Sequence, residues 1–123
     1  MERNMDLIRR ITLETAALPF GEWLVGMDGV SDEAFSAHAI WMEEAGLIKA
    51  SISEYMSGEP PKVLVHRLTW DGCEFADSIR DKTLWEKAKR EVIAPTMSFT
   101  FETLREWMKA EIIQGLPTIR RLA

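Results

Sequence analysis

Residues 31–48 read SDEAFSAHAIWMEEAGLI, and this stretch decides the fold. Ser31 is a typical N-cap residue, and the acidic residues after it suit the positive end of a helix dipole. The apolar residues recur at helical spacing and predict an inward stripe of Phe35, Ala39, Met42 and Ala45. Gly46 is the expected residue just past a helix end, so a strand can begin at Leu47. The stretch therefore predicts a helix over residues 32–45 that leads directly into a β-strand.

The next segment reads as a β-hairpin. Alternation of apolar and polar residues predicts a strand over residues 47–55, and residues 62–68 form the returning strand. Between them, residues 57–61 read SGEPP, a composition typical of a loop. We therefore expect a hairpin with a long tip.

Helices are predicted on both sides of this centre. Residues 4–17 read as a helix with Asn4 as N-cap, and residues 23–25 form a short extended segment after it. Thr69 is expected to cap a third helix over residues 70–79, whose apolar residues are Trp70, Cys73, Phe75, Ala76 and Ile79. This helix continues, or restarts at Thr83, to about residue 92, and Pro95 breaks the chain near there.

A last helix is predicted over residues 99–114, followed by a short basic tail at residues 118–123. The order helix, short strand, helix, hairpin, helix predicts an α+β fold of the winged-helix type. We place the winged-helix-like domain at residues 1–93 and a C-terminal helical extension at residues 94–123.

Two local strings strengthen this interpretation by resemblance. Residues 36–48, SAHAIWMEEAGLI, resemble the end of the recognition helix and the start of the wing in winged-helix regulators such as the ArsR-type repressors. Residues 68–72, LTWDG, resemble the end of the second wing strand and the cap of the next helix. The chain is thus similar to the winged helix-turn-helix superfamily.

The whole chain is also similar to a bacterial and phage-associated family called domain of unknown function 2513. The resemblance is carried by MDLIR at residues 5–9, AGLI at 45–48, LTWxG at 68–72, FxDxIRD at 75–81 and WEK at 85–87. This family implies a phage association but no activity, and it is the winged-helix resemblance that implies a transcriptional regulator that binds double-stranded DNA as a dimer. In that interpretation the helix over residues 32–45 approaches the major groove, with Ser36, Ala37, His38 and Trp41 facing it and Lys62 contacting from the wing.

Charge and helix count favour an alternative, a winged-helix module that binds another protein and not DNA. The net charge is −5, and residues 31–45 carry four carboxylates and no basic side chain. Recognition helices usually offer Arg, Lys, Asn or Gln to base edges and phosphates. A helix-turn-helix also needs a helix directly before the recognition helix, and residues 17–31 leave too little chain for one.

The last helix carries an apolar stripe of Phe101, Leu104, Trp107, Met108 and Ile112. Each large side chain contributes about 1.5–3 kcal/mol on burial, so this stripe packs on its own domain or on a symmetry mate. We expect it to make the contact of a homodimer.

No motif indicates catalysis. Cys73 is expected to be a core thiol, His38 a surface histidine unless it contacts DNA, and His66 a partly buried histidine on the side of Leu64 and Leu68. One cysteine and two distant histidines do not suggest a metal site. We therefore expect no enzyme activity, no metal and no cofactor.

Composition points to a protein of the cytoplasm. Apolar runs are far shorter than the roughly 20 residues that span a bilayer, so we expect no membrane association. The first residues lack the apolar region of a secretory signal, and the single cysteine excludes an internal disulfide.

Overall fold

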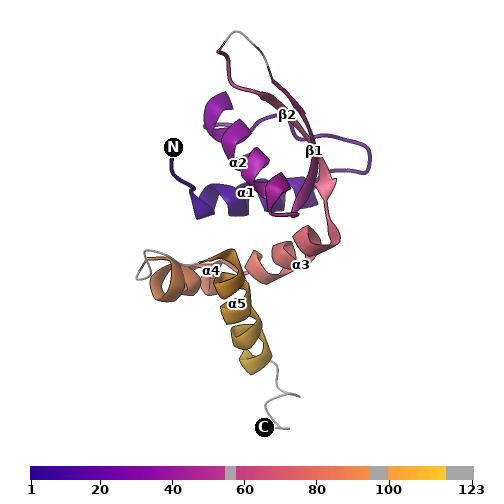
Figure 1. Ribbon diagram of the computed structural model, residues 1–123. Coiled ribbons are helices and arrows are strands. Elements are labelled where there is room, and N and C mark those ends of the chain that lie inside the picture. The colour runs from indigo at the N-terminus through magenta and orange to yellow at the C-terminus, as the bar shows by residue number, and fades with distance from the viewer. Residues whose placement is uncertain (55–57, 95–99, 116–123) are drawn as a thin grey trace. The chain divides into compact units, whose positions relative to one another are not determined.

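The computed structural model describes residues 1–54, 58–94 and 100–115. Its elements are α1 (Met5–Ala16), α2 (Asp32–Glu44), β1 (Ile48–Ser53), β2 (Lys62–Leu68), α3 (Trp70–Ile79), α4 (Lys82–Ala88), the π-helical segment η1 (Lys89–Ile93) and α5 (Phe101–Gly115). Figure 1 shows these elements along the chain. The order confirms the predicted α+β fold of winged-helix-like type. The predicted break at Pro95 and the tail at residues 118–123 lie outside the described residues.

The chain divides into two compact units, Met1–Ala76 and Asp77–Ala123. In the first unit, α1 and α2 pack against the hairpin of β1 and β2. The hairpin buries Ile48, Val63, Val65 and Leu68 on its inner face, while α2 contributes Phe35, Ala39 and Met42 to the core. Helix α1 buries Met5, Ile8 and Ile11 together with Thr12 and Thr15.

The caps of the first two helices agree with the sequence. Asn4 accepts hydrogen bonds from the backbone N–H groups of Asp6 and Leu7, and the Ser31 hydroxyl accepts one from Ala34. Helix α2 ends as predicted at Gly46, whose φ of 77° lies in the left-handed region that favours glycine. The N–H groups of Gly46 and Leu47 then donate to the carbonyls of Glu43 and Met42, which completes the helix end.

The junctions at the base of the hairpin hold α3 against the start of β1. The Leu47 carbonyl accepts a hydrogen bond of 3.0 Å from the Thr69 N–H. The Thr69 hydroxyl donates to the Gly46 carbonyl and accepts from the Gly72 N–H, so Thr69 caps α3 as predicted. A Cβ on Gly72 would lie only 2.0 Å from the Leu47 carbonyl oxygen. This approach is therefore possible only for a residue without a side chain.

A β-bulge changes which face of β2 points inward. The register pairs Lys49 with Arg67 and Ala50 with Val65, so His66 is the extra residue in β2. Leu68 is buried like Val65, although an unbroken strand would place the two residues on opposite faces. The prediction that His66 shares a side with Leu68 is therefore wrong, because the bulge lies between them.

Other predicted burial also differs in detail. Cys73 is exposed, so the prediction of a core thiol is wrong: α3 buries Phe75, Ala76 and Ile79 and turns Cys73 and Trp70 to solvent. Ala45, which was expected to close the α2 stripe, is exposed. Helical spacing identified the presence of an apolar face but missed its centre by part of a turn.

The second unit consists of α4, η1 and α5, with the last residues of α3. Asp81 caps α4, so the third helix of the sequence ends at Ile79 and a new one begins at Lys82. The core of this unit includes Trp85, Ala88, Val92, Leu104 and Met108. The Lys87 ammonium donates a 2.8 Å hydrogen bond to Glu111, which raises the pKa of Lys87. Because both side chains are partly exposed, this pair adds little stability.

Gly72→Ala is expected to lower the free energy of unfolding by about 2–3 kcal/mol or more, because the new Cβ meets backbone that cannot rotate away. Urea unfolding followed by circular dichroism measures the loss. Gly26→Ala is the matched control, because Gly26 has open space around its Cβ position and an ordinary φ. A Gly72→Ala variant as stable as the control would contradict the close approach.

Candidate functional site

The polar side chains of α2 that were expected to face DNA are turned into the protein. Ser36 is only 4% exposed, and its hydroxyl donates a 2.6 Å hydrogen bond to the Pro61 carbonyl just before β2. This bond ties the helix to the entry of the returning strand. The Ser36 hydroxyl is therefore occupied by the fold.

His38 is buried at 2% exposure and joins two helices. Its Nε2 atom accepts a 2.9 Å hydrogen bond from the Asn4 N–H, and its Nδ1 atom lies 2.8 Å from the Ala34 carbonyl. The carbonyl can only accept, so the ring carries its proton on Nδ1 and is neutral. The expectation of a surface histidine is wrong, because the ring holds the start of α1 against α2.

The outer side of α2 is acidic and partly apolar. Ala37 and Trp41 are half-buried, and the Trp41 ring lies edge-on to His38 with centroids 5.1 Å apart. Asp32, Glu33 and Glu44 are exposed. As predicted, no helix forms in residues 17–31, so no partner helix precedes α2.

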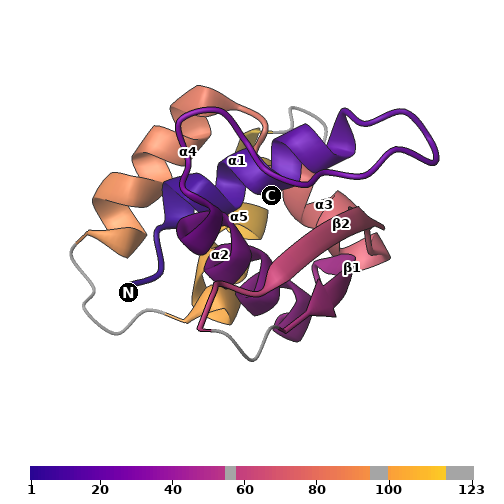
Figure 2. The same cartoon turned by 90° about the horizontal axis from the view of Figure 1, so that it is seen from above.

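An isolated β-bridge extends the two-stranded sheet on the side of β2 away from β1. Leu24 and Val65 exchange two backbone hydrogen bonds of 3.0 and 2.9 Å, which confirms the extended segment predicted at residues 23–25. Leu24 is buried on the inner face, so its neighbours Trp23 and Val25 point to the outer face. Figure 2 shows the connection between α1 and α2 projecting beyond α1 and returning past β2.

The outer sheet face is the surface formed by Trp23, Val25, Lys49, Ser51, Ser53, Lys62, Leu64, His66 and Arg67. The Trp23 and His66 rings meet edge to face at 4.5 Å between centroids. His66 is half-buried, as expected, and its Nε2 atom lies 2.6 Å from the Ser51 hydroxyl. These contacts hold Trp23 against the sheet while leaving 52% of it exposed.

The connection between α1 and α2 also presents Phe20 to solvent. The Glu22 N–H donates to the Pro19 carbonyl, and Gly21 has a φ of 89°, which together define a tight turn. Phe20 stands at this turn and is fully exposed, while Val25 is 60% exposed. We call Phe20, Trp23 and Val25 the apolar ridge.

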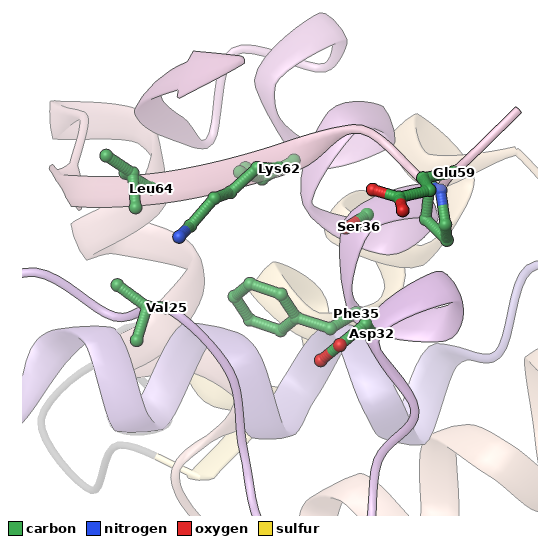
Figure 3. A pocket seen from close by; sticks show the side chains of 9 residues that line it. Val25, Asp32, Phe35, Ser36, Glu59, Lys62 and Leu64 are labelled. Carbon is green, nitrogen blue, oxygen red and sulfur yellow. The ribbon is translucent and has the colours of Figure 1, made fainter. Parts of the chain in front are cut away.

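A groove of about 620 Å³ lies beside the ridge, between β2 and the start of α2. Its lining consists of Val25, Asp32, Phe35, Ser36, Glu59, Pro60, Lys62, Val63 and Leu64. Figure 3 shows the Lys62 side chain extending along the groove toward Val25 and Leu64. The groove thus has an apolar floor of Phe35 and Val63, which are both buried, and a charged rim.

The groove brings together two of the five residues predicted to contact DNA, Ser36 and Lys62. Ala37, His38 and Trp41 do not line it. Of the predicted dimer residues, Leu104 and Met108 are buried, and α5 packs on α4 and η1. Phe101 and Trp107 are half-buried, and Ile112 is 36% exposed. The homodimer stays a prediction.

The described residues offer no group of three or more His, Cys, Asp or Glu side chains that could hold a metal ion. Within the same ranges, no helix has the length and apolar character needed to cross a membrane.

Residue patterns alone did not indicate the apolar ridge or the cations Lys49 and Arg67. A signal for the ridge was present, because Phe20 precedes a turn glycine and Trp23 and Val25 flank a single buried leucine. The pairing of Lys49 with Arg67 depends on the bulge at His66. No residue type in β2 indicates that a bulge occurs there.

The order of its helices and strands thus makes the chain a winged-helix-like α+β protein. Its outer sheet face and apolar ridge expose apolar and basic side chains. Residues 2–98 match the family described as Hypothetical protein (DUF2513), and the chain belongs to this family. A Haemophilus influenzae protein (strain ATCC 51907 / DSM 11121 / KW20 / Rd), described as "Uncharacterized protein", is 32% identical over 119 residues. The alignment covers 94% of this chain and 99% of the relative. No solved structure matches the chain.

His38→Ala is expected to lower the free energy of unfolding by about 2–4 kcal/mol, because it opens a cavity and removes the hydrogen-bond acceptor of the Asn4 N–H. Thermal and urea unfolding measure the change. Lys62→Ala is the control, and as an exposed substitution it should change stability by less than about 0.5 kcal/mol. Equal stability of the two variants would mean that His38 does not connect the helices.

Proposed function

We propose that this protein is a protein-interaction module and that the apolar ridge and the outer sheet face form its docking surface. The observation that carries the proposal is the exposure of Phe20, Trp23 and Val25 within six residues of chain. Exposed large apolar side chains that occur singly need no explanation, whereas three of them within six residues of chain favour an interaction site. Aromatic residues are also enriched among the side chains that dominate binding energy in protein interfaces.

The geometry of the ridge suits binding without rearrangement. The Trp23 side chain is held by His66 and by the Leu24–Val65 pair, and the backbone at Phe20 is held by a turn with a glycine in the left-handed region. Side chains fixed before binding lose less conformational entropy when a partner covers them. The groove next to Val25 can accept a partner side chain against Phe35 and Val63.

DNA binding through α2 receives less support. Ser36 and His38 use their polar atoms inside the protein, and the exposed charges of α2 are carboxylates. Carboxylates against phosphates would repel at the short distances of a major-groove contact, which a Debye length of about 10 Å does not screen.

A second candidate function is DNA binding by the hairpin instead of α2. The observation that favours it is the set of exposed cations Lys49, Lys62 and Arg67 on the outer sheet face. Phosphate contacts by such residues would make affinity fall steeply with salt. A regulator of transcription, with the phage association implied by the family resemblance, belongs to this candidate.

The test selects random 12-residue peptides displayed on phage against the immobilised full chain and measures the affinity of enriched peptides by fluorescence anisotropy. Phe20→Ser/Trp23→Ser is expected to weaken their binding at least tenfold. The matched control is Trp70→Ser, since Trp70 is also exposed, at 79%, but lies in α3. Peptides that bind the ridge variant as well as the wild type, or a selection that enriches nothing, would reject the proposed function.

A further inference from the structure

We infer that the partner segment is acidic, with carboxylates that pair with Lys49 and Arg67 at one end of the docking surface. This inference rests on the proposed function and names the chemistry of the partner. It comes from the placement of these two cations beside the apolar ridge.

The register sets two like charges directly opposite each other. Lys49 of β1 pairs with Arg67 of β2, and both side chains are exposed on the outer sheet face. Like charges at directly opposed positions of an antiparallel pair destabilise a sheet. The isolated domain therefore keeps an unfavourable arrangement that a bound anion would relieve.

The chain has more carboxylates than cations, but in the described residues none of these carboxylates forms an ion pair with Lys49, Lys62 or Arg67. It carries 20 acidic and 15 basic residues, and other cations form ion pairs, such as Arg10 with Glu14 and Lys87 with Glu111. Arg67 donates only to the Leu68 carbonyl, through one nitrogen of its guanidinium. The remaining donors of Arg67 suit a carboxylate.

The cations bracket the apolar part of the surface. His66 and Arg67 both point outward because of the bulge, so Arg67 lies beside the His66 ring that holds Trp23. Lys62 lies at the other end of β2, in the groove whose lining also includes Val25, Leu64 and the carboxylates Asp32 and Glu59. At about 3.3 Å per residue, the two ends of this row are roughly 15 Å apart. An extended partner segment of about five residues would span it, with acidic residues at the end that meets Lys49 and Arg67 and apolar residues along the rest.

The surface favours a polypeptide over a nucleic acid. Val25 and Leu64 are branched aliphatic side chains and offer no flat face for a base. Three cations are also few compared with the six to ten phosphate contacts typical of strong DNA binders. Binding of a nucleic acid is therefore the competing result that the experiment below can detect.

The experiment compares the composition of peptides selected by the wild type with that of peptides selected by Lys49→Glu/Arg67→Glu. Wild-type peptides are expected to be rich in Asp and Glu next to an apolar stretch, and their affinity should fall as salt rises. The variant should bind them at least tenfold more weakly. The control, Lys82→Glu/Arg90→Glu, makes the same change in net charge on two exposed cations of the second unit and should leave affinity within twofold.

Neutral or basic selected peptides that still require Phe20 and Trp23 would overturn the acidic partner and leave the proposed function standing. Failure to enrich any peptide would overturn both. A labelled duplex DNA fragment of mixed sequence is titrated in parallel. If it binds the wild type and not the Lys49→Glu/Arg67→Glu variant, and competes with the peptides, the partner is a nucleic acid and the inference is wrong.

A single substitution separates binding from folding. Lys49→Glu places a carboxylate opposite Arg67, so the variant is expected to melt at the same temperature as the wild type or higher. It should nevertheless bind the acidic peptides at least fivefold more weakly. A lower melting temperature would mean that the Lys49–Arg67 pair serves the fold, and would count against an anion site.

Discussion

The close approach between the Leu47 carbonyl and the first turn of α3 is the constraint on which the first unit depends. Leu47 ends the turn after α2 and begins the hairpin, and its carbonyl receives the Thr69 N–H from the far end of that hairpin. Gly72 allows this contact because it has no side chain to collide with the same oxygen. The two ends of the hairpin are thereby fastened at one point, so β1 and β2 must meet in a register that this base determines.

Because the base is fastened, the bulge at His66 has a defined consequence. The extra residue lets Leu68 reach the core beside the fastened end while Val63 and Val65 stay inward further along β2. The same shift turns both His66 and Arg67 outward, where one supports Trp23 and the other faces Lys49. The packing requirement of Leu68 and the charge pattern of the outer sheet face therefore have one structural cause. His66, the extra residue that allows Leu68 to reach the core, therefore also places side chains on the proposed docking surface.

Residue patterns predicted the fold well where local chemistry determines structure. The caps at Asn4, Ser31 and Thr69, the glycine after α2 and the hairpin follow from hydrogen bonding and backbone freedom within a few residues. Burial was harder to predict, because it depends on which side of an element meets the rest of the chain. For this reason His38 is buried and Cys73 is exposed, the reverse of what was predicted. Asn4, 34 positions away from His38, donates the hydrogen bond that makes a buried His38 possible. The apolar ridge and the Lys49–Arg67 pair likewise arise from contacts across the sheet.

The two sides of the first unit differ in the use they make of polar groups. On α2, Ser36 donates to the Pro61 carbonyl, His38 accepts the Asn4 N–H and hydrogen-bonds to the Ala34 carbonyl, and Glu43 accepts the Ala50 N–H of β1. These polar side chains of α2 therefore hold the helix to α1 and to the hairpin. The outer sheet face differs: its cations have no carboxylate partner in the described chain, and its Trp23 and Val25 side chains are more than half exposed. A fold of this order can therefore keep its helix as internal support and recognise a partner with its sheet, since recognition requires groups whose bonds the fold has not already used.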